Sequence, residues 1–440
     1  MSQSNIAPVP ASASTSKPKI VVVGTGWGGF TFAHSVNLAK YDVVVISPVR
    51  TVQYTPLLAS AAAGMFNFRL AEEPLRRRSK AAGLQYYKAV ATDIDFEKRS
   101  VQCKSAVEDL ADQGSETSHS FSVSYDKLVL APGCDIQTFG TPGAQDHALF
   151  LKTTNDARKI QQRLLEMLDA ASLPGLSDAQ QREILQIRIV GGGAIGIEAT
   201  AELWDAWEED LRFVYPHLQG KMTICIHDIA PAILTTFDKR LGDYALQKLK
   251  GRGVTVKTSS HIEKVEEQSL WTKEDGKQNF GLLIWATGNG VNPLVKKLKM
   301  KKVGKLQRIA TDRQLRVLGE DDRVMEGLYA MGDAADIDGH TLPTLAEVAV
   351  QKGEFLAREL NHKNEPTADF EYRQTANLAY IGEHDGVVGG TKEWMTGHRA
   401  WIAWRSGSIL HWPRSWRRTL MIGISWMFNW VGGRDIARKW

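Results

Sequence analysis

Two short glycine-rich turns in this sequence have the residue types and spacing that bind the pyrophosphate of a dinucleotide. In such a turn, the glycines permit a tight bend, let the backbone approach the phosphates and let the next helix pack closely on the strand. The phosphates lie at the helix N-terminus, where N–H groups and the helix dipole favour negative charge. Both turns have the pattern GxGxxG directly after a short apolar run, with glycines at Gly24, Gly26 and Gly29 and at Gly191, Gly193 and Gly196. Two such turns predict an enzyme with two dinucleotides, and the expected pair is a resident flavin and an exchangeable nicotinamide.

An acidic residue follows the next apolar run after the second turn. The run 222–227 is followed by Asp228, whose carboxylate can bind both hydroxyls of a ribose and repels the additional phosphate of NADPH. This residue therefore favours NADH over NADPH. His227 is the alternative ribose ligand, and a plain turn residue is the alternative role of Asp228.

The order of apolar runs and glycine turns predicts an α/β fold with two Rossmann-like dinucleotide-binding domains, the second nested within the first. At ~150 residues per domain, a chain of 440 residues has room for both and for a smaller third region. We expect a disordered leader over 1–18, a discontinuous first domain over 19–155 and 286–375, the second domain over 156–285, and a C-terminal region over 376–440.

The three cysteines, Cys103, Cys134 and Cys225, are scattered without a CxxC or similar spacing. This arrangement argues against a disulfide scaffold, a zinc site and a paired-cysteine redox centre. We therefore expect a reducing compartment, no metal ion, and a flavin that works without a thiol pair.

The end of the chain is both basic and rich in tryptophan. The segment 394–440 holds eight of the 13 tryptophans and eight Lys or Arg residues against one acid. That combination favours a surface for anionic phospholipid headgroups. Nucleic acid is the competing interpretation, but no nucleic-acid-binding motif accompanies the basic residues. The longest apolar run, 420–431, is shorter than the ~18–20 residues that span a bilayer.

Helical spacing in this segment predicts an amphipathic helix that lies in the membrane interface, with its apolar side among acyl chains and its arginines at the phosphates. An ordinary core or dimer helix is the alternative. The apolar stripe comprises Trp416, Leu420, Ile424, Met427 and Val431, whereas another side carries Arg418, Ser425 and Asn429. We expect the same membrane footprint to include Trp404, Arg405, Trp412 and Arg414.

Together these features resemble the type II (alternative) NADH:quinone oxidoreductases, which are flavoprotein reductases of respiratory membranes with two dinucleotide domains. The glycine turns and Gly332–Asp333 are common to many flavoproteins, whereas Tyr54–Leu58, Glu347 with Gln351, and the basic end are more specific. The blocks that carry the resemblance run in family order from residue 19 onward: Val23–Gly29, Ile46–Pro48, Tyr54–Leu58, Val190–Glu198, Trp285–Gly288, Ala330–Ala334, Ala346–Gln351 and Gly433–Ile436.

The resemblance implies that the first domain binds FAD non-covalently through its glycine turn and that the second admits NADH as substrate. Many relatives end the second strand with a ribose-binding carboxylate, where this chain has Ser47, whose hydroxyl binds more weakly. Asp333 resembles the aspartate that meets the flavin ribityl hydroxyls, and a helix cap after Gly332 is the alternative role. Further cofactor-binding positions implied in this way are Thr55, Gly133 and Gly288.

The resemblance also implies three catalytic residues. Glu198 matches a glutamate that faces flavin and nicotinamide and that positions NADH or relays a proton; stabilisation by the helix dipole is the alternative. Glu347 and Gln351 lie four residues apart on a helix expected over 344–360, and match two glutamines that line the quinone pocket. The glutamate at position 347 departs from the family pattern, and a solvent-facing position is the alternative for both residues. Glu202, one turn after Glu198, is expected to be structural.

The implied reaction is oxidation of NADH with two-electron reduction of a membrane quinone, ubiquinone in type, without proton pumping. The insertion 204–220 resembles mitochondrial members, so we expect a peripheral protein of the mitochondrial inner membrane, and a homodimer is the family expectation. A sulfide:quinone oxidoreductase is one alternative, although it needs two cysteines near the flavin. The others are a soluble ferredoxin- or disulfide-type reductase and a flavoprotein whose NADH-bound form acts as a signalling partner.

Overall fold

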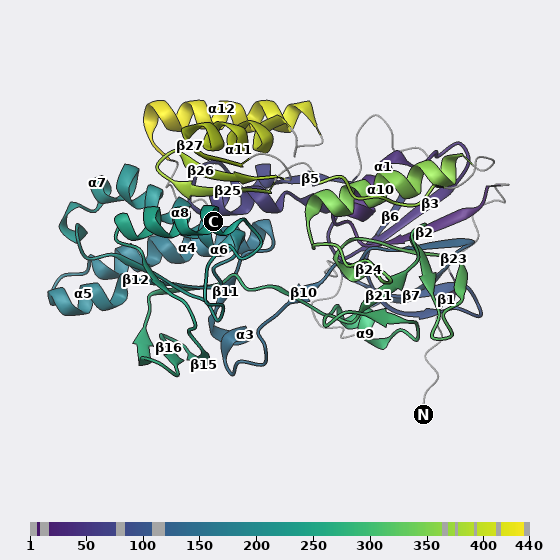
Figure 1. Cartoon of the computed structure of the whole chain (residues 1–440), viewed down its shortest axis with the longest axis horizontal. Coiled ribbons are helices and arrows are strands. Elements are labelled where there is room, and N and C mark those ends of the chain that lie inside the picture. The colour runs from purple at the N-terminus through teal and green to yellow at the C-terminus, as the bar shows by residue number, and fades with distance from the viewer. Residues whose placement is uncertain are drawn as a thin grey trace. The chain divides into compact units, whose positions relative to one another are not determined.

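The computed structural model describes residues 7–8, 17–75, 84–107, 119–362, 368–374, 377–390, 394–410 and 415–434. The chain divides into two compact units, each made from separated segments (Figure 1). The first unit comprises residues 1–52, 74–136 and 289–373, and the second comprises 53–73, 137–288 and 374–440.

The first unit is built on a large sheet whose centre is parallel. β2 (Lys19–Val23) pairs on one side with β3 (Asp42–Ser47) and on the other with β9 (Lys127–Leu130). β6 (Leu84–Asp95) continues the parallel set beyond β3, and β23 (Val324–Ala330) continues it beyond β9. This order places the first glycine turn, which follows β2, at the middle of the sheet, as a dinucleotide fold requires.

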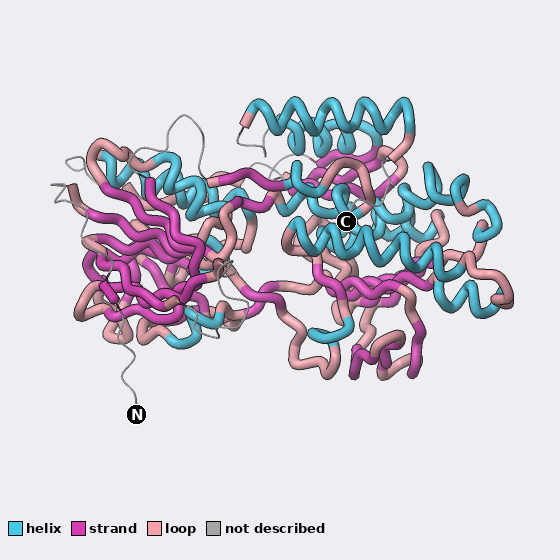
Figure 2. Tube along the Cα trace, turned by 180° about the vertical axis from the view of Figure 1, so that it is seen from behind, coloured by secondary structure: helices cyan, strands magenta, loops and turns pink. Residues whose placement is uncertain are grey.

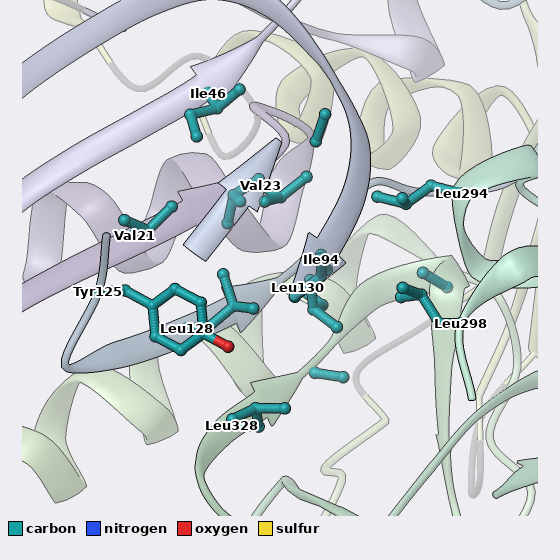
Figure 3. Close-up of a cluster of buried hydrophobic side chains, with 14 of the residues drawn as sticks. Val21, Val23, Ile46, Ile94, Tyr125, Leu128, Leu130, Leu294, Leu298 and Leu328 are labelled. Atoms are coloured by element: carbon teal, nitrogen blue, oxygen red, sulfur yellow. The ribbon is translucent and has the colours of Figure 1, made fainter. Parts of the chain in front are cut away.

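The central strands are rich in valine, isoleucine and leucine because their side chains are buried on both faces. Figure 3 shows Val21, Val23, Ile46, Leu128 and Leu130 in one buried cluster of this sheet. Shorter elements extend the sheet or join its strands: β1 (Ala7–Pro8), β7 (Ser100–Ser105), β8 (Ser120–Ser124), β10 (Asp135–Ile136), β19 (Asn289–Gly290), α9 (Pro293–Lys297), β20 (Lys302–Val303), β21 (Arg308–Thr311), β22 (Arg316–Leu318), η5 (Gly332–Ala334) and β24 (Ala335–Ile337).

Two helices of this unit pack closely on each other. α1 (Trp27–Ser35) follows the glycine turn, and α10 (Ala346–Asn361) matches the helix expected over 344–360. A Cβ added to Gly353 would lie 2.8 Å from the carbonyl oxygen of Gly28, so glycine is needed where the helices meet.

The second unit contains a smaller parallel sheet in the order β11 (Leu149–Phe150), β18 (Leu282–Trp285), β12 (Gln186–Val190), β13 (Thr223–His227) and β14 (Thr255–Lys257). Its glycine turn joins β12 to α6 (Ala194–Ala206). Figure 2 shows these strands in magenta and the helices in cyan. The predicted α/β class with two Rossmann-like units is therefore confirmed. Other elements of this unit are β4 (Thr51–Gln53), which begins in the first unit, η1 (Thr55–Leu57), α2 (Leu58–Ala62), η2 (Phe68–Ala71), β5 (Glu72–Pro74), which ends in the first, α3 (Ala144–His147), α4 (Thr154–Ala171), α5 (Asp178–Ile184), α8 (Lys239–Gly251), β15 (Ile262–Glu266), β16 (Ser269–Thr272) and β17 (Gly276–Asn279).

The long excursion expected over 204–220 is largely helical. α6 continues to Ala206 and passes into a π-helical turn over Trp207–Leu211, followed by α7 (Arg212–Val214) and η4 (Pro216–Leu218). Trp207 and Leu211 are buried, which fixes this extension on the unit. The polar sequence between them concealed the helical continuation.

The C-terminal region begins with a sheet that the sequence analysis missed. β25 (Asn377–Gly382), β26 (Asp385–Gly389) and β27 (Trp394–Gly397) form an antiparallel sheet, followed by α11 (His398–Leu410) and α12 (Trp416–Gly432) (Figure 1). β25 packs against α6 and α11 against β26, so this region is part of the second unit. Among the described residues, no helix is long and apolar enough to cross a membrane.

Candidate active site

In the first glycine turn, glycine occupies the three positions for different structural reasons. Gly24 has φ +105°, and a Cβ there would overlap the carbonyl oxygen of Ala131. A Cβ on Gly29 would overlap the carbonyl oxygen of Gly24. A Cβ on Gly26, by contrast, would have no atom of the described residues within 4 Å. The protein backbone itself therefore requires glycine at positions 24 and 29. Gly26 faces open space, where the phosphates of a ligand can approach the protein backbone.

The second turn repeats this arrangement. Gly191 has φ +115° and abuts the carbonyl oxygen of Ala286, while a Cβ on Gly196 would overlap the carbonyl oxygen of Gly191. A Cβ on Gly193 would again meet nothing within 4 Å in the part of the chain that the structure describes. The two turns thus have the same construction in separate units.

The helices that follow the turns have no side-chain N-caps. Gly26 caps α1 and Gly193 caps α6, both with extended backbones and no side-chain hydrogen bond at the cap. The first N–H groups of such helices need an acceptor from elsewhere, and phosphate oxygens supply one. Open space beside the middle glycine and an uncapped helix end together fit the pyrophosphate of a dinucleotide in both units.

The structure places Asp228 next to the second glycine turn. Its Oδ2 accepts a hydrogen bond of 2.5 Å from the Gly192 backbone N–H, and its Oδ1 accepts one of 2.7 Å from Ala230 N. His227 is buried, with Nδ1 3.0 Å from Ser260 Oγ, and burial lowers its pKa to about 4. Of the two candidates, Asp228 is therefore the one at the carboxyl end of β13 beside the turn.

Ser47 occupies the corresponding place in the first unit and pairs with a residue that the sequence analysis missed. Thr25 Oγ1 donates a hydrogen bond of 2.9 Å to the Val49 carbonyl oxygen and lies 2.9 Å from Ser47 Oγ. Because each hydroxyl has one hydrogen, Ser47 then donates to Thr25. Two hydroxyls thus join the end of β3 to the glycine turn, as Asp228 does in the second unit.

The loop after β9 and the turn η5 bring three candidate residues of the first unit together. Gly133 and Gly332 have φ values of +73° and +70°, which glycine adopts without strain. Cys134 Sγ donates a hydrogen bond of 3.4 Å to Asp333 Oδ2. Sequence spacing gave no signal for this thiol–carboxylate contact.

Two other cofactor candidates lie in the second unit. Thr55 begins η1, and Gly288 follows β18, where a Cβ would have no described residue's atom within 4 Å. Neither residue therefore belongs to the same unit as the first glycine turn.

Glu347 and Gln351 lie on one face of α10, as their spacing predicts. Gln351 Nε2 is 3.3 Å from Glu347 Oε1, and Tyr372 OH donates a hydrogen bond of 3.0 Å to Glu347 Oε2. The Gln351 side chain also donates a hydrogen bond of 2.8 Å to the Arg373 carbonyl oxygen and accepts one of 3.0 Å from the Arg373 backbone N–H. Burial and the neighbouring carboxylate raise the pKa of Tyr372. Both candidates are partly buried, with partners in the segment 368–374 that the sequence analysis did not anticipate.

Glu198 is buried in the first turns of α6 and is held by the C-terminal region. Its Oε1 accepts hydrogen bonds from Trp404 Nε1 at 3.0 Å and from Tyr380 N at 3.2 Å. Burial raises the pKa of Glu198 to about 8, more than these hydrogen bonds lower it. The carboxyl group therefore retains a proton at neutral pH. Trp404, expected in the membrane footprint, is instead a buried partner of this candidate catalytic residue.

Two further acids continue the same face of α6. Glu202 accepts a hydrogen bond of 2.5 Å from Ser60 Oγ, and Asp205 accepts bonds from Tyr380 OH and from Glu383 N. Burial raises the pKa of both carboxyl groups.

Arg434, near the C-terminus, contacts acids of the π-helical turn. Its Nη2 lies 2.8 Å from Glu209 Oε2, and its Nε lies 3.5 Å from Asp210 Oδ2. The guanidinium is buried and lowers the pKa of Glu202 and Asp205 against the effect of burial. Arg434 of the Gly433–Ile436 block thus connects the C-terminal region to the π-helical turn that follows α6.

α12 presents an apolar face to solvent. Trp416, Trp430 and Val431 are 79%, 87% and 77% exposed, whereas Ile422 and Trp426 are buried. The exposed set also contains Leu420, Ile424, Met427 and Phe428. The stripe predicted from helical spacing is therefore on the outside of the described unit.

The polar side of α12 contacts the protein, which corrects part of the predicted footprint. Arg418 Nε lies 3.7 Å from Glu73 Oε2, and Asn429 donates a hydrogen bond to the Met65 carbonyl oxygen. The Arg405 guanidinium carbon lies 3.7 Å from the centre of the Trp426 ring. These side chains point inward because their charge or amide finds partners there. Trp412 and Arg414 lie outside the described residues.

The fold and the two glycine turns define a nucleotide-dependent oxidoreductase with two dinucleotide-binding units. Residues 18–353 match the family model described as pyridine nucleotide-disulphide oxidoreductase. The chain is 34% identical to a probable NADH dehydrogenase of Dictyostelium discoideum, over 95% of this chain and 91% of that protein. It is 33% identical to the mitochondrial internal alternative NAD(P)H-ubiquinone oxidoreductase A1 of Solanum tuberosum, over 99% and 90% of the two chains.

Solved structures show the same fold. NDH2 from Plasmodium falciparum in complex with NADH superposes with a TM-score of 0.87 at 22% identity, covering 96% of this chain and all of that one. The sulfide:quinone oxidoreductase of Aquifex aeolicus gives a TM-score of 0.68 at 14% identity, covering 94% and 96%. The chain belongs to the pyridine nucleotide-disulphide oxidoreductase family and, within it, to the alternative NADH:quinone oxidoreductases. The resemblance predicted from the sequence is therefore confirmed.

Proposed function

We propose that this protein oxidises NADH and reduces a ubiquinone-type quinone through non-covalently bound FAD, without moving protons across the membrane. The relatives that support this proposal are named NADH dehydrogenase and NAD(P)H-ubiquinone oxidoreductase. The observation that carries it is the pair of glycine turns, each with open space at its middle glycine and an uncapped helix beyond.

The first unit supplies the residues for FAD. Bound there, FAD would supply the hydride-accepting and electron-donating chemistry that links NADH oxidation to quinone reduction. Gly26 and the N-terminal amides of α1 hold its pyrophosphate, with Gly24 and Gly29 shaping the turn. Ser47 is the ribose-side residue, and Asp333 binds the ribityl hydroxyls.

The second unit binds and orients NADH. Gly193 and the N-terminal amides of α6 hold the pyrophosphate, and Asp228 accepts hydrogen bonds from the ribose hydroxyls. Gly288, with no neighbouring atom at its Cβ position, leaves room for the ligand after β18. Glu198 carries its proton at neutral pH, so it can donate a hydrogen bond to NADH or a proton toward the quinone.

The quinone site is assigned to α10. Glu347 and Gln351 face the same way, and Tyr372 donates a hydrogen bond to Glu347. A carboxylate in place of the family's glutamine accepts this bond strongly. The contact between Glu347 and Tyr372 thereby holds the side chains of α10 that can bind a quinone carbonyl.

The exposed apolar face of α12 binds the membrane surface. Trp416 and Trp430 are exposed on this face together with aliphatic residues, and tryptophan on the apolar face is typical of helices that lie in the membrane interface. The mitochondrial names of the relatives support a position on the mitochondrial inner membrane. A homodimer is proposed from the family alone.

An absorbance experiment tests this function directly. The purified protein should show a flavin spectrum that bleaches on anaerobic addition of NADH and recovers when a soluble ubiquinone analogue is added. Colourless protein that takes up no FAD would refute the proposal. Bleaching without recovery on quinone addition would refute the quinone step alone.

A further inference from the structure

A polar trough lies on one face of the parallel sheet in the second unit. Its volume is about 280 Å³, near the lower end of the ~300–1,000 Å³ typical of small-molecule clefts. Gln278 of β17 forms part of its wall. The other polar residues that line it come from three neighbouring strands, β12 to β14: Gln186, Arg188, Thr223, Cys225, Thr255 and Lys257.

The strand register explains why these side chains share one face. Arg188 pairs with Cys225, which pairs in turn with Thr255, so the three form one row across the sheet. The intervening residues of β12 and β13 are buried isoleucines, of which Ile187 and Ile224 also contribute to the lining of the trough. Parallel sheets normally bury apolar residues on both faces. The polar row is therefore a departure that ordinary packing does not explain.

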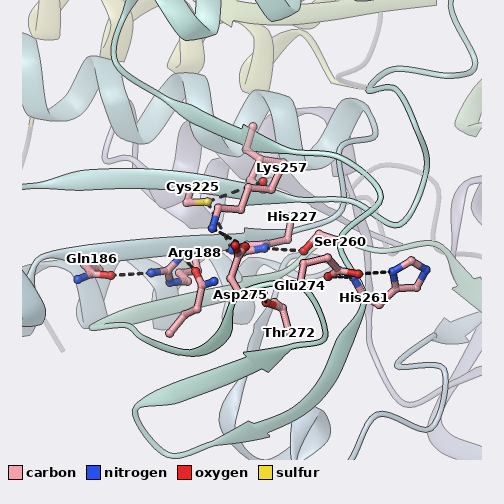
Figure 4. Close-up of polar contacts among 12 residues, drawn as sticks. Gln186, Arg188, Cys225, His227, Lys257, Ser260, His261, Thr272, Glu274 and Asp275 are labelled. Atoms are coloured by element: carbon pink, nitrogen blue, oxygen red, sulfur yellow. Dashed lines mark hydrogen bonds and ion pairs between the residues drawn. The ribbon is translucent and has the colours of Figure 1, made fainter.

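Arg188 provides a half-buried positive charge in this trough. Its guanidinium donates hydrogen bonds to Gln278 Oε1 at 2.6 Å, to Gln186 Oε1 at 2.7 Å and to the Asn279 carbonyl oxygen at 2.9 Å. These acceptors are all neutral. No ion pair among the described residues includes Arg188, so no carboxylate lies within ion-pair distance of this half-buried guanidinium. Figure 4 shows Arg188 beside Cys225 and His227.

The surrounding groups leave the trough positive. Lys257 Nζ lies 2.6 Å from Asp275 Oδ2, so one lysine and one aspartate neutralise each other (Figure 4). Burial raises the pKa of the Cys225 thiol and lowers that of His227, so both are neutral at pH 7. Glu274, the other acid on the hairpin between β16 and β17, pairs with His261 at 2.7 Å. Asp275 also attracts Arg188 at longer range, but this single carboxylate faces two cations, so the trough keeps one net positive charge.

We propose that this trough is a binding site for a compact polyanion, a di- or tricarboxylate or a phosphate ester, held by Arg188 and Lys257. The hydroxyls of Thr223 and Thr255 and the amide of Gln278 supply further hydrogen-bond donors. A ligand with two or more negative charges satisfies Arg188 and competes with Asp275 for Lys257.

The trough and the second glycine turn share the same strands. Gln186 and Thr223 begin β12 and β13, whose other ends lead into Gly191 and Asp228. A ligand in the trough can therefore alter the position of the residues assigned to NADH. This coupling rests on the proposed function, whereas anion binding itself does not.

Binding is tested on the full chain with citrate and phosphoenolpyruvate as the two test anions, at constant ionic strength and without NADH. Calorimetry should show saturable binding of at least one of them, and which one binds identifies the carboxylate or the phosphate source. Cys225 lines the trough, so bound anion should also slow its alkylation by N-ethylmaleimide, measured by peptide mass spectrometry. Alkylation of Cys134, which lies in the first unit, is the internal reference.

Variants locate the site. R188Q and K257Q should each weaken binding about tenfold, because each removes a charge-assisted hydrogen bond. K257Q carries this test if R188Q fails to fold. K264Q is the matched control, since Lys264 pairs with Glu266 and does not line the trough, and it should leave binding unchanged. The proposal would be overturned if neither anion bound, or if K264Q weakened binding as much as R188Q and K257Q do. Loss of binding in D228N would also overturn it, because the anion would then occupy the NADH site.

Discussion

Alanine substitutions in the second glycine turn should separate NADH binding from folding. Gly193 has φ −75°, which alanine adopts freely, and its Cβ would meet no protein atom. Gly196 lies inside the turn, where a Cβ would overlap the Gly191 carbonyl oxygen. The added methyl group therefore points into open space in G193A and overlaps a backbone carbonyl oxygen in G196A.

The expected magnitudes follow from these positions. Overpacking of the kind in G196A costs ~1–3 kcal/mol, and a unit of this size loses ~2–4 °C in melting temperature per kcal/mol. In G193A, the ~0.4–1 kcal/mol gained by restricting the unfolded chain approximately offsets the poorer N-cap. G193A should therefore melt within about 2 °C of the wild type, and G196A several degrees lower. The methyl group that G193A adds enters the space assigned to the pyrophosphate, so the KM for NADH should rise at least about tenfold.

The assay combines thermal unfolding followed by circular dichroism with steady-state NADH oxidation and a soluble quinone. The flavin absorbance of each variant is the control, because the first unit is unchanged and FAD should be retained. A wild-type KM in G193A would show that NADH does not use this turn. Equal loss of melting temperature in the two variants would refute the assignment of open space at Gly193.

Three further predictions concern other parts of the site. D228N should lower the ratio of kcat/KM for NADH over NADPH about tenfold, because a charge-assisted hydrogen bond to the ribose is lost, and an unchanged ratio would contradict the assignment. The pKa of Glu198 rises to about 8 on folding, so the wild type loses stability relative to E198Q as the pH rises from about 4.5 to 8. The difference in melting temperature between E198Q and wild type should therefore grow across this interval, and a constant difference would refute the raised pKa. W430S should weaken binding to anionic liposomes about tenfold, as burial of a large apolar side chain contributes ~1.5–3 kcal/mol. F213S is the control, because Phe213 is 65% exposed on α7, outside the proposed membrane face; equal weakening by both would argue against α12 as the anchor.

The missed features have a common cause. β25–β27 were not recognised because glycine and polar residues interrupt their short apolar runs, and the helical extension after α6 carries three consecutive acids. Thr25 and Tyr372 gave no signal because a single hydroxyl residue is common in loops. Their roles come only from the partners that folding brings near, Ser47 and Glu347.

Features that depend on local backbone geometry could be predicted from the amino-acid sequence. The two turns, their strands and helices, and the acid after β13 were all predictable, because glycine conformation and the path from strand to helix are set within a few residues. The apolar stripe of α12 was predictable for the same reason, since helical spacing fixes which side chains share a face.

The contacts between distant polar groups, by contrast, became visible only in the folded protein. Glu198 and Trp404 are separated by 206 positions, yet their hydrogen bond and shared burial decide the protonation of the candidate catalytic acid. The same applies to Arg418 and Arg405, which the basic composition assigned to lipid and which folding directs to Glu73 and Trp426. A pKa or a charge partner depends on the whole environment of a side chain, and that environment exists only once distant segments have packed together.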